Sequence, residues 1–142
     1  MRTDFHNQLV EWRQYHHPVP ETGFDLSITP DFVAARLQEM GIEVHRNIGK
    51  TGLVGIIRKG NGGRTIGLRA DMDALPIKEI TGLPYVSTHA GKMHACGHDG
   101  HTSTLLGAAK LLKEEYEFNG TVILIFQPDE ENGKGARAMI AD

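Results

Sequence analysis

Four side chains that can bind a metal or transfer a proton lie within six residues in the middle of the chain. They are the thiol of Cys96, the imidazoles of His98 and His101, and the carboxylate of Asp99. Thiolate, imidazole and carboxylate ligands together suit zinc or a neighbouring first-row ion such as manganese, cobalt or nickel. A structural zinc finger is not indicated, because the chain has one cysteine and no second ligand pair at finger spacing. The residue types therefore favour a metal site of another kind.

Two acidic clusters supply what a hydrolytic metal site needs besides its first ligands. Asp71 and Asp73 are two residues apart, so in an extended chain both side chains project to the same side and can converge on one point. Glu130 and Glu131 are adjacent and would project to opposite sides of an extended chain. One of them could then bind a metal while the other takes a proton from the attacking water. Either cluster alone would indicate only a solvated acidic turn, but together with the central cluster they favour a hydrolase.

Two other interpretations of the central cluster stay open. The first is a helix start that Asp99 caps, with the histidines exposed to solvent. The second is a cysteine hydrolase in which His98 acts as the base for Cys96. The positive end of the following helix is expected to favour the thiolate form of Cys96. The cysteine mechanism, however, gives the neighbouring carboxylates no role.

The composition is that of a soluble globular protein and argues against several classes of function. The chain has 142 residues, enough for about one domain, with 39% apolar and 23% charged residues. A formal net charge of −3 without a basic run argues against a nucleic acid or a membrane as partner. No apolar run is long enough to span a membrane, and the first residues are unlike a signal peptide. The lone cysteine makes the reducing cytoplasm the expected location.

The residue pattern predicts an α/β layered domain that positions these clusters. Thr29 as cap and Pro30 at the first helical position predict the start of a helix that ends at Gly41. Each acidic cluster follows a strand and the central cluster opens a helix, at the edge where open α/β sheets bind ligands. A long loop over 71–99 is expected to be functional. The predicted elements are helices over 4–15, 29–40 and 102–116 and strands over 42–48, 53–58, 65–69 and 122–126, the last covered on both faces.

Three segments closely resemble the amidohydrolase family of metallopeptidases, which includes hippurate hydrolase, N-acyl-amino-acid amidohydrolases and auxin-conjugate hydrolases. They occur in the family's order and spacing, and the string Ala-Cys-Gly-His-Asp-Gly-His at 95–101 is the most specific part. The resemblance implies a zinc-exopeptidase-like catalytic domain, with a mixed sheet flanked by helices. It also implies two divalent ions, zinc or manganese with nickel or cobalt as alternatives, and hydrolysis of the amide bond of N-acyl amino acids or similar conjugates. The segments are Leu68–Pro76, Met93–Thr102 and Phe126–Glu131.

The resemblance also implies a role for each side chain of the clusters. Cys96 would bridge the two metal ions, and His98 and Glu131 would be further ligands. Glu130 would be the general base that activates the water and carries its proton to the leaving amine. Asp73 would assist catalysis by orienting or supporting the metal site. Asp71, Asp99 and His101 would steady the ligands from behind.

The chain departs from the family pattern in two ways. His17-Pro18 is separated from Glu21 by Val19-Pro20, where family members run directly from His-Pro to Glu; such an insertion in a surface turn is tolerated. Family members are also more than twice as long. The resemblance implies that two further histidine ligands and a smaller inserted domain, which usually mediates homodimer formation, lie outside residues 1–142.

The expected unit is therefore the N-terminal portion of a catalytic domain, inactive by itself. The alternative function is that of a non-catalytic fragment that binds a metal or associates with a partner chain through an unfinished sheet.

Overall fold

The structure is a computed structural model that describes residues 2–142. Two helices, three strands, a helix and a strand follow one another as the pattern predicts, and the α/β class with a mixed sheet flanked by helices is confirmed. None of the helices in the described part of the chain is long and apolar enough to cross a membrane. The elements are α1 (Arg2–His16), α2 (Ile28–Glu39), β1 (Glu43–Ile48), β2 (Gly52–Lys59), β3 (Thr65–Asp71), α3 (His98–Glu114), β4 (Gly120–Gln127) and α4 (Gly135–Ala141).

The strands form one sheet in the order β1-β2-β4-β3. β2 pairs antiparallel with both β1 and β4, whereas β3 pairs parallel with β4 from Thr65 opposite Thr121 to Asp71 opposite Gln127. β4 is therefore an inner strand, and β3 and β4 end at the same edge of the sheet. Side chains that follow these two strands meet at that edge, which is where open α/β sheets form their ligand sites.

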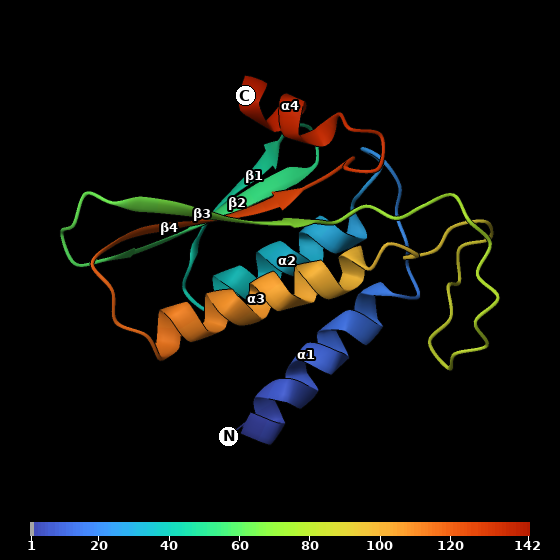
Figure 1. Cartoon of the computed structure of the whole chain (residues 1–142), viewed down its shortest axis with the longest axis horizontal. Helices are drawn as coiled ribbons and strands as arrows, with labels where there is room; N and C mark the ends of the chain where they lie inside the picture. The colour runs from blue at the N-terminus through green and yellow to red at the C-terminus, as the bar shows by residue number, and fades with distance from the viewer. Residues whose placement is uncertain (1) are drawn as a thin grey trace.

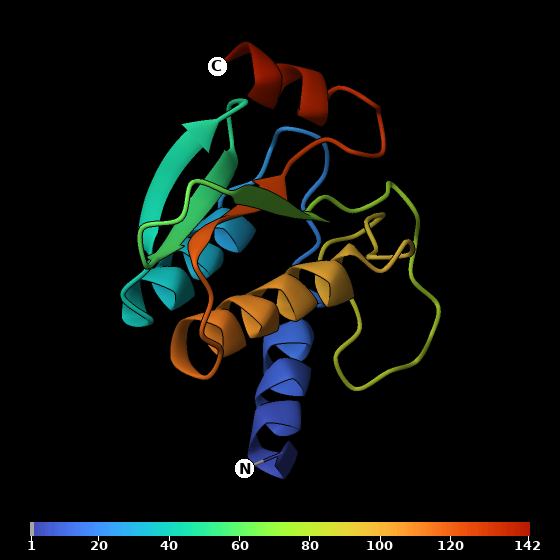
Figure 2. The same ribbon diagram turned by 60° about the vertical axis from the view of Figure 1, so that its left-hand side comes forward.

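The helices lie on both sides of the sheet. α2 and α3 cover one face, and α4 lies over the other face (Figures 1 and 2). α1 packs against α3, so closely at Gly107 that an added Cβ would lie 2.6 Å from the side chain of Leu9. The core lies between the sheet and these helices, and its most buried members are Val33, Leu37, Leu53, Ile57, Met72, Leu106, Ala109, Leu124 and Phe126.

The strand predicted over 122–126 is present, but its two faces are covered unequally. Val122, Leu124 and Phe126 are buried beneath the helices, whereas Ile123 and Ile125 on the other face are only partly buried. The reason is that α4 has seven residues and covers only part of that face, leaving a groove that Ile123 and Ile125 help to line. The prediction of a strand covered on both faces is therefore only half right.

The start of α2 differs from the prediction. The N-cap is Ser27 rather than Thr29, and the Ser27 side chain makes no capping bond. Instead the carboxylate of Glu21 accepts hydrogen bonds from the backbone N–H groups of Ser27, Ile28 and Thr29, at 2.7 to 2.9 Å. A carboxylate satisfies the free N–H groups of a first turn and complements its positive dipole. The cap thus comes from a residue outside the helix.

α3 begins at His98 rather than at the predicted Thr102. Gly97 precedes it with φ +90°, a left-handed conformation that glycine adopts without a steric penalty. The helix is longer than predicted because residues distant in sequence hold its first turn through His98 and Asp99. α4 was not predicted; it packs where Gly49 leaves room for Met139.

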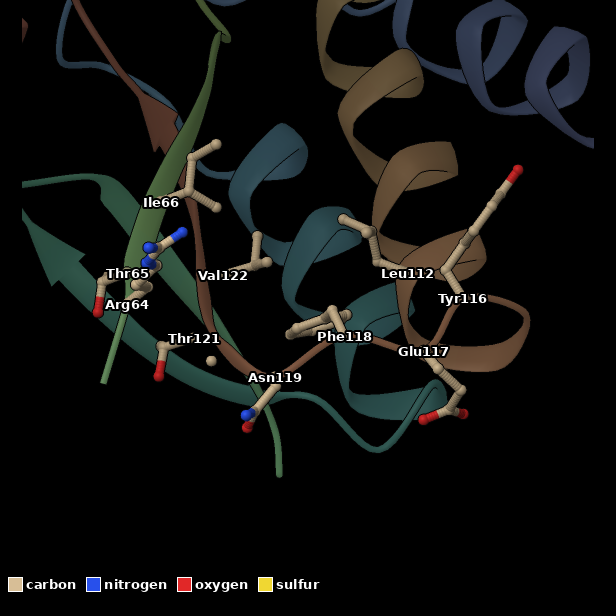
Figure 3. Close-up of a pocket in the computed structure, with 11 residues that line it drawn as sticks. Arg64, Thr65, Ile66, Leu112, Tyr116, Glu117, Phe118, Asn119, Thr121 and Val122 are labelled. Atoms are coloured by element: carbon tan, nitrogen blue, oxygen red, sulfur yellow. The ribbon is translucent and has the colours of Figure 1, made fainter. Parts of the chain in front are cut away.

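The two ends of the β3–β4 pair differ in character. At the end where both strands begin, a cavity of about 590 Å³ is lined by apolar and polar side chains together, with Ile66 and Tyr116 exposed (Figure 3). At the end where both strands finish, acidic, imidazole and thiol groups lie together. The chemistry predicted from the sequence is confined to that second end.

Candidate metal centre

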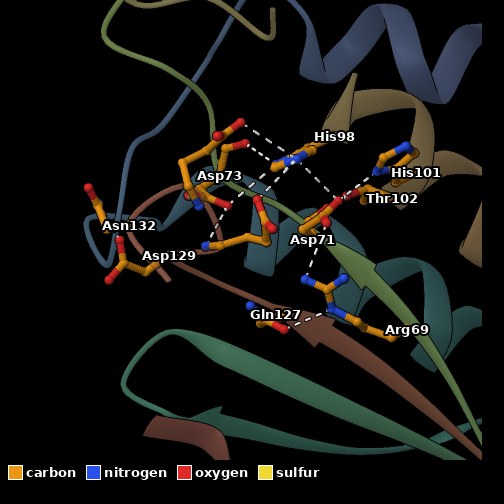
Figure 4. A network of polar contacts seen from close by, with 11 residues as sticks. Arg69, Asp71, Asp73, His98, His101, Thr102, Gln127, Asp129 and Asn132 are labelled. Atoms are coloured by element: carbon orange, nitrogen blue, oxygen red, sulfur yellow. Dashed lines mark hydrogen bonds and ion pairs between the residues drawn. The ribbon is translucent and has the colours of Figure 1, made fainter. Parts of the chain in front are cut away.

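The site is assembled at the carboxyl ends of β3 and β4 and the first turn of α3. The imidazole of His98 lies at its centre, 2% exposed (Figure 4). Its Nε2 lies 3.5 Å from Asp71 Oδ1, 3.7 Å from Glu130 Oε2 and 3.7 Å from Glu131 Oε1. Its Nδ1 lies 3.4 Å from Asp73 Oδ1. The two acidic clusters predicted to converge therefore do so, around one ring.

The orientation of His98 is fixed by a backbone bond. Nδ1 lies 2.7 Å from the carbonyl oxygen of Asp73, and because a carbonyl only accepts, Nδ1 carries the proton. In the neutral ring Nε2 then carries the free lone pair, which is directed at the carboxylates. This is the arrangement of a histidine that binds a metal through Nε2. Burial would lower the pKa of His98, but its bonds to Asp73 and the charge of Asp71 raise it above its ordinary value.

Asp73 also closes the turn that carries the second acidic pair. Its Oδ1 accepts the backbone N–H of Glu130 at 3.0 Å and its Oδ2 accepts that of Glu131 at 3.1 Å. Burial would raise the pKa of Asp73, but the bonds to His98 and to these two N–H groups hold it below its ordinary value. The backbone is a turn rather than an extended chain, and it begins at Asp129 with φ +47°. Glu130 and Glu131 therefore both approach Nε2 of His98, which corrects the expectation that they project to opposite sides.

The three residues predicted to bind metal lie together. Cys96, His98 and Glu131 each offer a ligand atom within 4.8 Å of the others. Oε1 of Glu131 is buried and accepts no hydrogen bond from the part of the chain that the structure describes. A thiol, an imidazole nitrogen and an unsatisfied carboxylate oxygen directed at one point fit a divalent cation.

Cys96 behaves differently from the sequence prediction. The residue is exposed, yet its pKa is raised rather than lowered, first by desolvation of the thiol, then by the charge and a hydrogen bond of Glu131, and then by the charge of Glu130. These carboxylates outweigh the dipole of α3, so the expected thiolate is not favoured while no cation is bound. A thiol with a raised pKa is a poor nucleophile, which argues against the cysteine hydrolase. A cation between the thiol and the carboxylates would reverse the effect.

The supporting residues divide into two groups. Oδ1 of Asp71 lies 2.6 Å from Nδ1 of His101, and Asp71, His98 and His101 form a second set with ligand atoms within 4.8 Å of one another. The guanidinium of Arg69, which the sequence did not single out, lies 3.3 Å from Oδ2 of Asp71 and donates to Gln127. Arg69 and Gln127 could have been found from the sequence by their positions at the ends of β3 and β4, next to the acidic clusters.

Asp99 lies on the other side of the same turn of α3. Its Oδ2 lies 2.8 Å from Nδ1 of His17 and accepts a hydrogen bond from Nε of Arg13 at 3.1 Å. It is 1% exposed, and it is not the helix cap, since Gly97 occupies that position. Asp99 therefore faces a buried polar group rather than the metal ligands. Apart from the histidine before Pro18, no pattern in the sequence indicated that group.

Comparison with known proteins agrees with this geometry. Residues 67–142 match the peptidase family M20/M25/M40. Over 98% of its length the chain is 53% identical to the hippurate hydrolase of Campylobacter jejuni and 46% identical to the IAA-amino acid hydrolase ILR1-like 5 of Arabidopsis thaliana. The crystal structure of the YXEP protein of Bacillus subtilis, a dinuclear metal binding peptidase from the M20 family, matches 99% of the chain with a TM-score of 0.95 and 41% identity.

These similarities extend over only part of each relative. The chain spans 36% of the hippurate hydrolase, 32% of the IAA-amino acid hydrolase and 40% of the YXEP chain. Within that part, the resemblance and the layered fold predicted from the sequence are both confirmed.

Proposed function

The chain belongs to the peptidase family M20/M25/M40, and on that premise we propose that it serves metal-dependent hydrolysis of the amide bond in N-acyl amino acids or similar conjugates. The observation that carries the proposal is the convergence of Cys96, His98 and Glu131 on one point, with Glu130 beside them. The names of its relatives, a hippurate hydrolase and an IAA-amino acid hydrolase, support this substrate class. Because the chain spans about a third of those relatives, the substrate of the whole protein is part of the proposal.

Cys96, His98 and Glu131 would hold the metal, with Cys96 between two divalent ions. Zinc or manganese suits this donor set, and nickel or cobalt is the alternative. Bound ions would polarise the scissile carbonyl and ease deprotonation of a water. Asp73 would hold the imidazole of His98 and the turn of Glu131 in register, through the bonds described above.

Glu130 is the proposed general base. Its side chain is 38% exposed against 19% for Glu131, so it is the carboxylate of the pair more open to water and substrate. It would take a proton from the attacking water as the oxygen adds to the amide carbon. It would then give that proton to the nitrogen as the carbon–nitrogen bond breaks, so that a carboxylic acid and an amine leave.

We further propose that residues 1–142 act as the N-terminal portion of a catalytic domain and that the longer protein is a homodimer. A catalytic zinc ion commonly has three protein ligands, and the set Cys96, His98 and Glu131 supplies three in all. The second set, Asp71, His98 and His101, shares His98 with the first, so the two sets together give fewer than three ligands to each of two ions. The 142-residue chain is therefore expected to bind about one ion and to hydrolyse no N-acyl amino acid at a measurable rate.

A chimera tests the proposed function. The aligned 139 residues of the Campylobacter jejuni hippurate hydrolase would be replaced by this chain, and turnover of hippurate and of N-acetylated amino acids measured with added zinc or manganese. The chimera is expected to be active. Glu130→Gln should lower turnover by roughly 10²–10⁴-fold, as loss of a general base does, without loss of bound metal.

Glu117→Gln is the matched control, since the Glu117 side chain is 93% exposed and lies at the other end of the sheet. It should leave turnover unchanged. Full activity of the Glu130→Gln chimera would refute the assignment of the base, and an inactive, metal-loaded chimera would refute the proposed function. Robust turnover by the 142-residue chain alone would refute its proposed inactivity and favour a self-sufficient enzyme.

A further inference from the structure

His17 lies where three segments meet behind the metal centre. It follows α1 and is 3% exposed, between the first turn of α3 and the long segment 72–97. Its Nδ1 lies 2.8 Å from Oδ2 of Asp99, and its Nε2 lies 3.1 Å from Oε1 of Glu79. The partner side chains are 0% and 1% exposed. One buried imidazole thus joins two carboxylates that are distant in sequence.

The partners decide the chemistry of His17. A carboxylate oxygen accepts a hydrogen bond from a ring N–H, and each ring nitrogen of His17 lies within hydrogen-bond distance of one. Bonds between ionised groups are stronger than neutral ones, and buried ion pairs are costly to break from one side. Arg13 adds a cation at Asp99, 3.1 Å from Oδ2. Arg13, His17, Glu79 and Asp99 therefore form one ionic unit, here called the anchor network.

One arm of the anchor network fixes the rotation of α3. Asp99 directly follows His98, and adjacent side chains on a helix are about 100° apart, so holding Asp99 sets the direction in which His98 points. The helix start has no side-chain cap, because Gly97, with φ of +90°, precedes it. On the metal side the first turn is held by the bonds of His98 to Asp73 and of His101 to Asp71. Asp99 holds the opposite side of the turn.

The other arm fixes the segment that carries Cys96. Oε2 of Glu79 accepts the backbone N–H of Ser87 at 2.6 Å, so Glu79 closes the 79–87 part of this segment on itself. The next residue, Thr88, donates its backbone N–H to the carbonyl of Pro18 at 2.8 Å. The segment therefore docks on the residues around His17 before it reaches Cys96.

From this geometry we infer that His17 is a positioning residue of the metal centre, which aligns His98 and Cys96 through Asp99 and Glu79 without touching either ligand. The inference rests on the proposed function for the identity of the ligands. It predicts that loss of His17 weakens metal binding more than its effect on stability explains. Outer residues that orient metal ligands typically change metal affinity by about 10–100-fold.

The test titrates the 142-residue chain with Co²⁺ and follows the thiolate-to-cobalt absorption band, which reports Cys96 at the metal. His17→Phe keeps a ring but removes both ring nitrogens, and it should weaken Co²⁺ binding about 10–100-fold and change the band. Glu79→Gln breaks only one arm and should weaken binding by a smaller factor. Leu106→Ala, in the core of α3, is the control that lowers the melting temperature but should leave the band and the affinity unchanged.

A second measurement needs no metal. Amide hydrogen exchange at 98–101 in the metal-free chain should speed up in His17→Phe and Glu79→Gln beyond the change in Leu106→Ala. Unchanged affinity, band and exchange in these variants would overturn the inference. If the unsubstituted chain binds no Co²⁺, the proposed metal centre of this chain fails, and the exchange rates alone then decide whether His17 fixes the turn.

Discussion

Histidines on the two sides of the first turn of α3 have opposite electrostatic surroundings. His98, surrounded by the carboxylates of Asp71 and Asp73, has a raised pKa although it is buried. His16 and His94 lie near Asp99 but have no hydrogen-bond partner on either nitrogen among the described residues, and burial lowers the pKa of each to about 4. Burial is common to all three rings, so the carboxylates within bonding distance of His98 account for the opposite direction of its pKa shift.

The largest expected effect is acid destabilisation by His16 and His94. Each pKa of about 4 in the folded chain lies below 6.5, so between these values the unfolded chain binds more protons and stability falls as the pH drops from about 6.5 towards 4. At pH 4 each ring is expected to cost about 3 kcal/mol. Urea unfolding followed by circular dichroism at pH 7 and pH 4 measures the loss.

His16→Phe separates this effect from the rest of the acid response. Phenylalanine keeps the ring contact with Phe32, whose centroid lies 4.7 Å away, but cannot titrate. About 3 kcal/mol of the loss at pH 4 should be recovered in this variant. A variant that loses as much stability as the parent chain would show that His16 is not neutral in the fold. The pH dependence that His98 contributes has the opposite sign. Its contribution to the stability of the fold is complete below pH 6.5 and is lost as the pH rises through its raised pKa.

Asp73→Ala should cause the next largest loss of stability, because the Asp73 carboxylate contacts both His98 and the turn of Glu130 and Glu131. The backbone N–H groups of Glu130 and Glu131 lose a charged partner, and a loss of about 3 kcal/mol in unfolding free energy is expected. Asp73→Asn keeps one acceptor oxygen and should lose less. Equal stability of the two variants and the parent would show that the turn forms without Asp73.

Glu131→Gln should alter the metal centre and not the fold. Removal of a ligand charge is expected to weaken Co²⁺ binding by roughly 100-fold, about 2.7 kcal/mol. Glu130→Gln is the matched comparison, and as the proposed base it should change affinity by less than about tenfold. Calorimetric titration of both variants distinguishes the two residues. If Glu130→Gln weakened binding more than Glu131→Gln, their proposed roles would have to be exchanged.

The smallest effect is expected at Arg69, at the rim of the centre. Its side chain is 46% exposed and lies 3.3 Å from Asp71, so Arg69→Met should change the unfolding free energy by less than about 1 kcal/mol. The measurement is urea unfolding at low and high salt. A larger loss of unfolding free energy that does not depend on salt would mean that the ion pair of Arg69 with Asp71 behaves as a buried one.

Periodic apolar residues predicted the strands and the bodies of the helices. For the site, residue types indicated a metal cluster, and the family resemblance implied Cys96, His98 and Glu131 as ligands, which the structure brings within 4.8 Å of one another; their role as ligands stays a prediction. The sequence was insufficient where a contact joins distant residues. Asp73 bonds Glu131 across 58 positions and His17 bonds Asp99 across 82, and no local pattern reveals either pair. The turn of the second acidic pair and the first turn of α3 were missed for that reason.

The parallel pairing of β3 with β4 has a consequence for the order of events in folding. The two strands are neighbours in the sheet although the whole segment 72–119 separates them in the chain. Closing so long a loop costs conformational entropy before any contact repays it, and such pairings form slowly. Asp73, His98 and Glu131 come together only once that closure is complete. A cation that binds this site stabilises the folded chain, and the added stability grows with the logarithm of its free concentration once that concentration exceeds the Kd.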